Sequence, residues 1–380
     1  MSWPLVKLGN IVDIKGGGTP SKSNPEFWGG NIPWASVKDF KSSSLKETAD
    51  YITKLGVEKS ATNVIPAGNV IVPTRMALGK VAINEVDMAI NQDLKALLVN
   101  DEKTLSKLYL MRFLESKAAF IDEQGKGATV KGITLDVLRN LEIPLPPLPE
   151  QKRIAAILDK ADAIRRKRQQ AIQLADDLLR AVFLDMFGDP VTNPKRWPTM
   201  RVDELCTIVR GSSPRPQGDP RFYGGPVPRL MVADLTRDGK VVTPMIDSLT
   251  AEGAKKSRPI EAGTVVMAVS GNVGLTSVLA IDACIHDGFI AFKELDVNKV
   301  KPAFLCELMM FLKSTHASRQ AGAIFQNLTT SQIKEMEIPI PPLELQDKFL
   351  SISRKATELY GEEGFSLFES LSQRAFSGQL

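Results

Sequence analysis

The sequence is poor in the residues that usually bind metals or form disulfide bridges. Its 380 residues contain three cysteines, Cys206, Cys284 and Cys306, and two histidines, His286 and His316. The cysteines are odd in number and show no Cys-x-x-Cys spacing, which argues against a disulfide framework and against a structural zinc site. Neither histidine lies near a cysteine or carboxylate cluster with the spacing of metal ligands. We therefore expect no metal site in this chain.

Long apolar runs are also missing. No stretch approaches the ~20 apolar residues that a membrane-spanning helix needs, and the N-terminal MSWPLVKLGN lacks the apolar region of a signal peptide. Hydrophobic residues make up 43% of the chain and charged residues 24%, as in ordinary globular proteins. We expect a cytoplasmic protein that has no membrane partner. A chain of 380 residues exceeds what one core usually supports, so two domains are expected.

Complete catalytic motifs are absent as well. Gly125-Lys126-Gly127 is too short for the phosphate-binding Gly-x-x-x-x-Gly-Lys loop. Asn24-Pro25-Glu26-Phe27 matches only part of the Asn-Pro-Pro-aromatic box of adenine methylases, and Asp87 with Asp93-Leu94-Lys95 matches only part of a nuclease pattern. The corresponding parts of the second half of the chain keep neither motif. We therefore predict no active site; a free-standing methylase or nuclease with an unrecognised site stays the alternative.

The chain contains an internal duplication with an offset of 195 residues. Glu142-Ile143-Pro144 matches Glu337-Ile338-Pro339, and Gln151 matches Gln346. Further matches keep this register: Lys15-Gly16 with Arg210-Gly211, Phe27–Gly30 with Phe222–Gly225, Ala67-Gly68 with Ala262-Gly263, and Ile133-Thr134 with Leu328-Thr329. A globular unit of about 140 residues followed by a long helix is therefore present twice, with a period too long for a solenoid.

Each unit ends in a proline-rich lead and a long helical pattern. Residues 145–149 should be extended, because proline fixes φ and removes a hydrogen-bond donor. No proline or glycine interrupts the chain from Glu150 to Phe187, which predicts one helix on the order of 55 Å long. Its heptad pattern predicts a seam for a partner helix, formed by Ile154, Ile157, Ala161, Ile164, Ala171, Ala175, Leu178 and Val182.

The second copy of the helix, within residues 339–380, is the predicted partner. The residues that continue the heptad phase are Phe349, Ile352, Ala356 and Leu359. Gly361 and Gly364 predict a kink or a break in this copy. An antiparallel pairing, with a pseudo-two-fold axis between the halves, would place the cations of residues 165–168 opposite the acidic residues of 360–363. Exposed ion pairs contribute only about 0–1 kcal/mol, so this contact would set register more than stability.

The rest of each unit has a mixed pattern. Short runs rich in valine and isoleucine predict strands at residues 69–73, 80–84 and 96–99, and at 264–268, 276–280 and 289–292. Residues 105–120 and 302–313 suit helices, and residues 16–22 and 211–216 are predicted loops. The expected fold class is α+β. Two duplicated globular domains, residues 1–143 and 196–338, are separated by the helices of residues 144–195 and 339–380, which form an antiparallel coiled coil.

Loops of both halves carry polar and cationic residues that can bind DNA. The net charge of +4 is too small for a general polyanion binder, so contacts with nucleic acid must come from patches. The candidates are Lys15, Thr19, Ser21, Lys22, Lys38, Arg75, Lys126 and Lys131 in the first half, and Arg210, Ser213, Arg215, Arg221, Arg229, Arg237 and Gln326 in the second. Because arginine commonly binds guanine edges with two hydrogen bonds, the preferred base readers are Arg75, Arg215, Arg229 and Arg237.

Motifs spread over the whole chain resemble those of one protein family. They are Gly127–Thr134 running into Leu141–Ile154, the Gly-x-Thr-Pro-Ser loop of Gly17–Ser21, Asn31–Trp34 with Lys38-Asp39, and Arg374–Gly378. Together they resemble the specificity subunit of a type I restriction-modification enzyme. The second half departs from the pattern, since Gly211–Pro216 lacks the Thr-Pro-Ser form and Ala323–Asn327 replaces the Lys-Gly loop. Such divergence is expected of two domains that read different bases.

This resemblance implies two target-recognition domains, each of which reads one half of a bipartite, asymmetric site in double-stranded DNA. The helices would set the spacer between the half-sites and dock two modification subunits, which bind S-adenosylmethionine and methylate adenine N6. Two ATP-dependent and Mg-dependent restriction subunits would complete the complex, so no cofactor is expected in this chain. Ile172, Leu179 and Phe183, which lie outside the seam, would bind a partner or pack on the chain's own domains. A scaffold that does not bind DNA is a further alternative.

Overall fold

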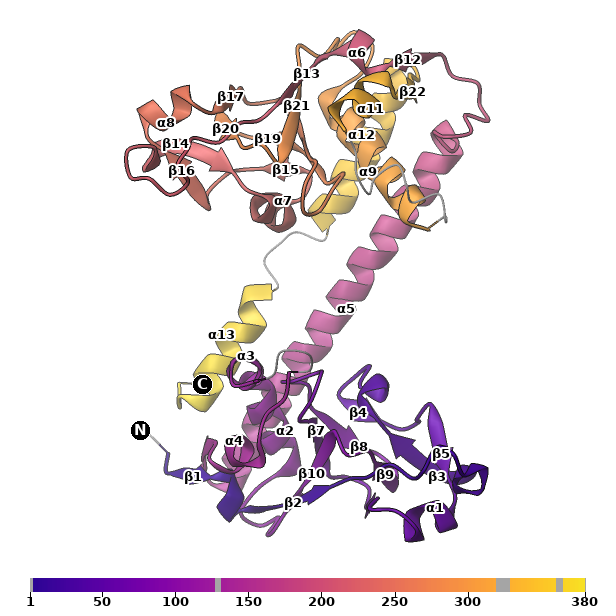
Figure 1. Cartoon of the computed structure of the whole chain (residues 1–380), viewed down its shortest axis with the longest axis vertical. Coiled ribbons are helices and arrows are strands. Elements are labelled where there is room, and N and C mark those ends of the chain that lie inside the picture. The colour runs from indigo at the N-terminus through magenta and orange to yellow at the C-terminus, as the bar shows by residue number, and fades with distance from the viewer. Residues whose placement is uncertain (1–2, 127–130, 319–328, 360–364, 380) are drawn as a thin grey trace. The chain divides into compact units, whose positions relative to one another are not determined.

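The structure is a computed structural model that describes residues 3–126, 131–318, 329–359 and 365–379 (Figure 1). The chain divides into two compact units. Unit 1 contains Met1–Gln170 and Glu362–Leu380, and unit 2 contains Ala171–Gly361. Each unit therefore joins one globular domain to segments of both long helices.

The globular domain of unit 1, which we call domain 1, contains two sheets. The five-stranded sheet has the order β2 (Val12–Gly16), β10 (Leu94–Val99), β7 (Val70–Pro73), β8 (Ala82–Asn84) and β4 (Ser44–Leu45). The four-stranded sheet has the order β5 (Asp50–Ile52), β3 (Trp28–Ala35), β9 (Met88–Ile90) and β6 (Val64–Ile65). A further pair, β1 (Leu5–Lys7) with β11 (Glu142–Pro144), leads into the long helix.

Domain 2, in unit 2, repeats this strand order position by position. Its five-stranded sheet has the order β13 (Thr207–Arg210), β21 (Phe289–Lys293), β18 (Val265–Ala268), β19 (Thr276–Leu279) and β15 (Val241–Val242). Its four-stranded sheet has the order β16 (Asp247–Leu249), β14 (Tyr223–Leu230), β20 (Ala283–Ile285) and β17 (Arg258–Ile260), and β12 (Thr199–Arg201) pairs with β22 (Glu337–Pro339). The duplication and the predicted strands are confirmed.

Short helices connect these strands. Domain 1 contains η1 (Leu8–Asn10), η2 (Pro25–Phe27), η3 (Val37–Asp39), α1 (Lys54–Glu58), α2 (Lys107–Ser116), α3 (Ala118–Glu123) and α4 (Leu135–Arg139). Domain 2 contains α6 (Val202–Leu205), α7 (Val232–Asp238), α8 (Ala251–Lys255), α9 (Pro302–Ser318) and α11 (Thr330–Glu335). The helix predicted at residues 105–120 is thus two helices, α2 and α3, which meet at Lys117.

Two buried glutamines show that the duplication extends to hydrogen bonds. Gln151 accepts a hydrogen bond from one backbone N–H and donates to two carbonyls, at 2.9, 2.8 and 2.9 Å from Ser106, Thr104 and Pro146. Gln346 makes the same three bonds, at 3.0, 2.9 and 2.8 Å from Lys301, Lys299 and Pro341. Every partner lies 195 residues after its counterpart, so the two domains attach to their helices in the same way.

The first long helix, α5, spans Leu148–Phe187 without interruption, as predicted. It begins two residues earlier than expected, so the prediction of an extended conformation is wrong for Leu148 and Pro149. Proline is tolerated in the first helical turn, because the N–H that it lacks would have no partner within the helix there.

The buried face of α5 differs from the predicted heptad seam. The buried residues are Gln151, Ile154, Ala155, Leu158 and Asp162 in unit 1, and Ala175, Leu179, Phe183 and Phe187 in unit 2. Ile164 and Leu178, which the heptad pattern places on the seam, are 67% and 59% exposed. The buried residues of unit 2 are four apart, whereas those of unit 1 are spaced by one, three and four. The buried stripe is wider than a heptad seam, because α5 packs against a globular domain as well as against a second helix.

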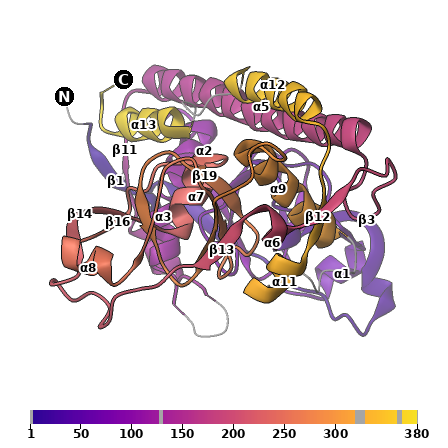
Figure 2. The ribbon, with the colours of Figure 1, turned by 90° about the horizontal axis from the view of Figure 1, so that it is seen from above.

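The second copy of the long helix consists of α12 (Leu343–Leu359) in unit 2 and α13 (Phe365–Phe376) in unit 1. Near its start α12 contacts the end of α5, where the ring of Phe349 lies 5.4 Å from that of Phe183. In unit 1, α13 runs antiparallel to the first part of α5 (Figures 1 and 2), and Ala375 shares a core with Ile154. Antiparallel pairing is thus confirmed within each unit. The predicted break at Gly361 and Gly364, and the charge pairing of residues 360–363, lie outside the described residues.

The main core of each unit joins a five-stranded sheet to the helices. In unit 1 this core includes Val70, Leu97, Phe113, Ile154 and Ala375, and in unit 2 it includes Val265, Ile290, Leu308, Phe183 and Phe349. Each domain therefore buries part of its apolar surface against both copies of the long helix. No helix in the described parts of the chain has the length and apolarity needed to cross a membrane.

Candidate nucleic-acid interface

A loop and a turn lie side by side at the same place in both domains. The first loop follows β2 in domain 1 (residues 17–22) and β13 in domain 2 (residues 211–216), and the turn links β9 to β10 (residues 91–93) or β20 to β21 (residues 286–288). In domain 1 the N–H of Gly18 donates to the carbonyl of Ile90 at 3.0 Å, and in domain 2 the N–H of Ser212 donates to that of Ile285 at 3.1 Å. A Cβ at Gly17 would lie 2.0 Å from the Ile90 oxygen, so this close approach requires glycine.

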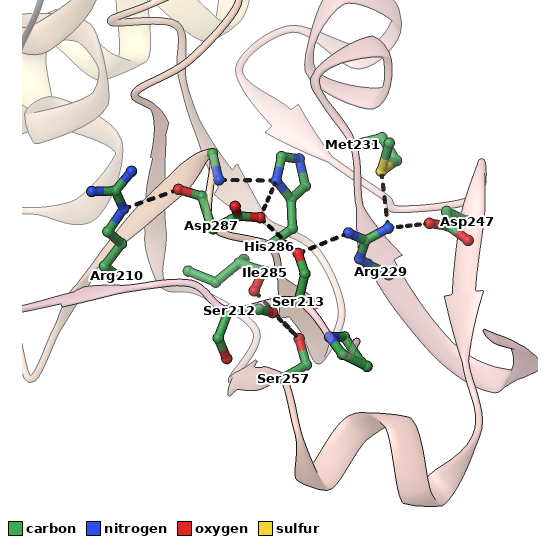
Figure 3. Close-up of polar contacts among 12 residues, drawn as sticks. Arg210, Ser212, Ser213, Arg229, Met231, Asp247, Ser257, Ile285, His286 and Asp287 are labelled. Atoms are coloured by element: carbon green, nitrogen blue, oxygen red, sulfur yellow. Dashed lines mark hydrogen bonds and ion pairs between the residues drawn. The ribbon is translucent and has the colours of Figure 1, made fainter. Parts of the chain in front are cut away.

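The turn exposes one side chain between less exposed neighbours. In domain 1 this residue is Gln92, which lies between the buried Asn91 and Asp93. In domain 2 it is Asp287, whose side chain is 55% exposed, whereas that of His286 is 15% exposed. A hydroxyl of the first loop contacts each of them. Thr19 bonds to the side-chain oxygen of Gln92, and Ser213 donates to Asp287 Oδ1 at 2.7 Å (Figure 3).

Cationic side chains gather around the turn of domain 1. Lys95 Nζ donates to the carbonyl oxygen of Gln92 at 2.6 Å, and Arg75 Nη1 lies 3.9 Å from Asp93 Oδ1. Partial burial and the neighbouring Arg75 lower the pKa of Lys95. The backbone of Lys131 bonds to that of Met76 at 3.1 Å, next to Arg75. Two carboxylates lie beside these cations, since Arg75 faces Asp93 and Lys131 Nζ pairs with Asp122 at 2.7 Å.

The other candidates of domain 1 lie apart from this group or at its edge. Lys15 at the end of β2, and Ser21 and Lys22 in the first loop, are exposed. Lys126 pairs with the backbone of Gly132, beside Arg75. Lys38 lies on η3, where its Nζ is 3.8 Å from an oxygen of Asp50, and no described contact links it to the turn.

In domain 2, arginines surround the corresponding turn (Figure 3). Arg210 Nε donates to the carbonyl oxygen of Asp287 at 3.0 Å, just as Lys95 does to Gln92. Arg215 Nη2 lies 3.8 Å from Asp287 Oδ2, and its side chain is 70% exposed. A cation thus bonds to the backbone of the exposed turn residue in both domains.

Three further candidates of domain 2 are placed differently. Arg221 is exposed, but its guanidinium forms a bidentate ion pair with Asp219, with the shorter contact at 2.6 Å. Arg237 on α7 binds Asp234, Asp238 and the carbonyl of Thr243. Gln326 lies outside the described residues.

Arg229, expected to be a base reader, is buried on β14. Its guanidinium pairs with Asp247, donates to Ser213 Oγ at 3.1 Å and lies 5.4 Å from the ring centre of Tyr223. Only 6% of its side chain is exposed, so Arg229 cannot reach a base without leaving Asp247. Arg229 bonds to the Ser213 hydroxyl, which in turn donates to Asp287, so its guanidinium lies behind the turn and not on the exposed surface.

Sequence reasoning did not include Gln92, Lys95 or Asp287 among the candidate binding residues. A usable signal was present, since all three come shortly before the strands predicted at residues 96–99 and 289–292. A glutamine or an aspartate in a turn has no charge pattern that marks it as a DNA-binding residue. Their position beside the first loop depends on the pairing of the turn with a segment about 70 residues away in sequence, which is a tertiary contact.

The described residues contain no group of three or more His, Cys, Asp or Glu side chains that could hold a metal ion. The three cysteines are buried. Burial raises the pKa of Cys206 and that of Cys306 to about 12, so neither thiol ionises near neutral pH. Such thiols are poor nucleophiles and poor metal ligands.

The residues predicted to bind a partner lie mostly inside unit 2. Leu179 is 9% exposed and Phe183 is 2% exposed, and the ring of Phe183 stacks on that of Phe311 at 4.6 Å. Ile172 is half-buried. The alternative that these residues pack on the chain's own domain is therefore correct for Leu179 and Phe183. The exposed apolar residues on this part of α5 include Leu174 and Leu178, which are 61% and 59% exposed.

Comparison with known proteins gives a consistent answer. The chain matches the family described as "Type I restriction modification DNA specificity domain" over residues 2–174 and 194–356. It is 24% identical to the MjaIX specificity subunit of Methanocaldococcus jannaschii, over 92% of this chain and 85% of that protein. It is 38% identical to the EcoR124I/EcoR124II specificity subunit of Escherichia coli, over 41% and 40% of the two chains.

A solved structure shares the fold. The crystal structure of the type I restriction-modification S subunit from M. genitalium superposes with a TM-score of 0.56 at 17% sequence identity, and the match covers 98% of this chain and 96% of that one. The family match covers both copies of the duplicated unit. The chain therefore belongs to the family of type I restriction-modification specificity subunits.

Proposed function

We propose that this specificity subunit recognises a bipartite and asymmetric site in double-stranded DNA, with each domain reading one half-site through its first loop and its turn. The observation that carries the proposal is the difference between the two turns. The same backbone arrangement presents an amide at Gln92 in domain 1 and a carboxylate at Asp287 in domain 2. Two readers with different hydrogen-bonding groups select different bases, so the two half-sites differ.

Cations around each turn support the DNA-binding role. Arg75 and Lys95 lie at the turn of domain 1, and Arg210 and Arg215 lie at the turn of domain 2. Contacts of lysine and arginine with phosphate position a protein on the duplex, while contacts with base edges supply the sequence information.

Domain replacement tests this proposal. Residues 196–338 are exchanged for the corresponding domain of another specificity subunit, and the methylated sites in host DNA are mapped by single-molecule sequencing. We expect one half-site to change, while the other half-site and the spacer stay as they were. A change in both half-sites would show that the domains do not read independently.

We also propose that the long helices set the distance between the half-sites. In DNA, successive major-groove faces on one side lie about 34–36 Å apart, so a rigid helical connection can impose a spacing. Removal of one helical turn from α5 should shorten the spacer in the mapped sites. An unchanged spacer would exclude this role.

The exposed residues Leu174 and Leu178 of α5 are proposed to bind a modification subunit, in place of Leu179 and Phe183. Replacement of either leucine by lysine should prevent co-purification of the modification subunit and leave thermal stability unchanged. Gln173→Lys is the matched control, because Gln173 is exposed on a different face of the same turn. Retention of the modification subunit by both leucine variants would reject this surface.

The proposed function assigns the chemistry to other chains. Two modification subunits would bind S-adenosylmethionine and methylate adenine N6, and two restriction subunits would use ATP and Mg. The purified single chain, incubated with DNA and S-adenosylmethionine, should transfer no methyl group; methylation by this chain alone would favour an enzyme. A scaffold without DNA contacts would give an assembled complex whose binding to DNA lacks the steep salt dependence of phosphate contacts.

A further inference from the structure

We infer that the exposed turn residue is the specificity-determining side chain of each domain, and that Gln92 selects adenine while Asp287 selects cytosine. The inference rests on the proposed function and deepens it, because it names the base that each residue takes. It is carried by the backbone of the turn, which presents one exposed side chain at the same place in both domains and binds it to a hydroxyl of the first loop.

Each turn residue is oriented before DNA binds. The hydroxyl of Thr19 contacts the side-chain oxygen of Gln92, and the hydroxyl of Ser213 donates to Asp287 Oδ1 at 2.7 Å. The backbone carbonyl of each turn residue also accepts a hydrogen bond from a cation, Lys95 at 2.6 Å or Arg210 at 3.0 Å. When both the side chain and the backbone carbonyl of a residue are hydrogen-bonded, the residue loses little conformational entropy on binding, and this favours a role in recognition.

Gln92 carries the pair of groups that matches adenine. Its amide nitrogen donates and its amide oxygen has a second lone pair beyond the one that faces Thr19. Adenine presents N7 as an acceptor and the N6 amino group as a donor in the major groove. A single glutamine can therefore form two hydrogen bonds with adenine.

Asp287 offers only acceptors, since the hydrogen bond from Ser213 lowers the pKa of its carboxyl group and keeps it ionised. The amino group of cytosine N4 is a donor without an acceptor atom beside it on the major-groove edge. In adenine the N7 lone pair lies next to the amino group and would repel the second carboxylate oxygen. An exposed carboxylate is repelled by the DNA phosphates, and a hydrogen bond to cytosine N4 would offset this repulsion. A base without such a donor would leave the repulsion without compensation, and binding would weaken.

The difference between the domains continues behind the turn. In domain 2 the buried Arg229 donates to Ser213 Oγ at 3.1 Å, and Ser213 in turn donates to Asp287. In domain 1 the equivalent residue, Trp34, donates from its indole nitrogen to the carbonyl oxygen of Gly18 at 3.0 Å. The positive charge of Arg229 behind Ser213 stabilises the negative charge of Asp287. The neutral indole of Trp34 is compatible with the neutral amide of Gln92.

Isosteric exchange of the two readers tests the inference in the complex with the modification subunit. The variants are Asp287→Asn and Gln92→Glu. For each variant, binding is measured to duplexes in which every base pair of both half-sites is changed in turn, and methylated sites are mapped in host DNA. Glu261→Gln is the control, because Glu261 is an exposed carboxylate just after β17, next to the end of β20 away from the turn.

With Asp287→Asn we expect the preference at one position of one half-site to shift from cytosine toward adenine by about 10–100-fold, because an amide can bind adenine with two hydrogen bonds. With Gln92→Glu we expect the converse shift in the other half-site. Each variant should leave the half-site of the unchanged domain as it was, and the control should alter neither.

Two outcomes would overturn the inference. One is an unchanged base preference in both variants, and the other is a weaker binding that is uniform over all sequences, including complete loss, which would indicate a phosphate contact or a structural role. In either case the wild-type complex and the domain replacement would still show two independent half-sites. If domain replacement itself failed to change a half-site, the proposed function would fall instead.

Discussion

Domains 1 and 2 share a backbone but support their first loops with different chemistry. In domain 1 the indole of Trp34 packs edge-on against Trp28, with ring centres 5.1 Å apart. In domain 2 the two equivalent residues are Arg229 and Tyr223, whose contact is a cation–π interaction at 5.4 Å. The buried glutamines Gln151 and Gln346, by contrast, keep every hydrogen bond.

This comparison teaches which parts of the duplicated unit tolerate change. Bonds that attach a domain to the long helices are repeated in both units, since any loss leaves buried backbone groups without partners. Side chains behind the loops differ, because an aromatic pair and an ion pair can fill the same space when their neighbours change with them. The side chains behind the loops can therefore diverge without a change in the framework.

The largest expected effect concerns the phenylalanines at the ends of the long helices. Phe183 is 2% exposed and contacts the rings of Phe187, Phe304, Phe311 and Phe349. Phe183→Ala should lower the free energy of unfolding of unit 2 by about 3–5 kcal/mol. Phe376, in the other copy, is half-buried and contacts the rings of Tyr109 and Phe113, so Phe376→Ala should cost unit 1 about half as much.

Urea unfolding monitored by hydrogen exchange reports on each unit separately. It therefore measures the loss of unfolding free energy in both variants. If both variants lost the same unfolding free energy, the larger aromatic cluster of unit 2 would give no extra stability to the packing of α5.

The next effect compares two aspartates at the same position of their sheets. Asp247 faces the buried Arg229 across β14 and β16, and Asp50 faces Trp34 across β3 and β5. Asp247→Ala would leave a buried guanidinium unpaired and should destabilise domain 2 by about 3 kcal/mol. Asp50→Ala removes only the exposed pair with Lys38 at 3.8 Å and should cost under about 1 kcal/mol.

Thermal unfolding of the two variants gives the comparison directly. If Asp50→Ala were as destabilising as Asp247→Ala, the ion pair could not be what distinguishes domain 2 from domain 1.

The buried glutamines should behave alike. Gln151→Leu and Gln346→Leu each leave one backbone N–H and two carbonyls without a partner, and each should cost about 2 kcal/mol. Hydrogen exchange at the start of α5 and of α12 measures the local loss. If the losses of stability at the two sites differed by more than about 2 kcal/mol, the two attachments would not be equivalent.

The smallest effect is a pH dependence confined to domain 2. His286 Nδ1 accepts a hydrogen bond from the N–H of Gly288 at 2.9 Å, and burial followed by the nearby Arg229 lowers the pKa of His286 below its ordinary 6.5. The unfolded chain therefore takes up this proton at a higher pH than the folded chain. The stability of domain 2 should be complete above pH 6.5 and should fall as the pH drops below it.

Asn91 fills the place of His286 in domain 1 and accepts the corresponding bond from Asp93 at 3.1 Å without titrating. The variant His286→Asn should thus remove the pH dependence and retain the bond. Hydrogen exchange of β20 and β21 between pH 7 and pH 5.5 measures the effect. A loss of protection that persists in the asparagine variant would assign the pH dependence to another group.

Much of the architecture could be predicted because it depends on local pattern. The strands rich in valine and isoleucine and the uninterrupted helix up to Phe187 are properties of short stretches, and the offset of 195 residues follows from comparing such stretches along the chain. The candidate site was predicted only in outline. Thr19, Arg75, Ser213, Arg210 and Arg215 do lie beside the turns, while Arg229 is buried and Arg237 is bound on its own helix.

The sequence by itself determined the repetition, the helix length and the kind of residue that each loop carries, because periodicity and the presence of proline and glycine act over a few residues. Only the tertiary structure decided which face of α5 is buried and which loop residues are exposed. Leu178 and Leu179 are adjacent in sequence and equally apolar, yet 59% of the first and 9% of the second is exposed. That choice depends on the surface that packs against the helix, and this surface comes from residues far away in the sequence, such as Leu275 and Phe311.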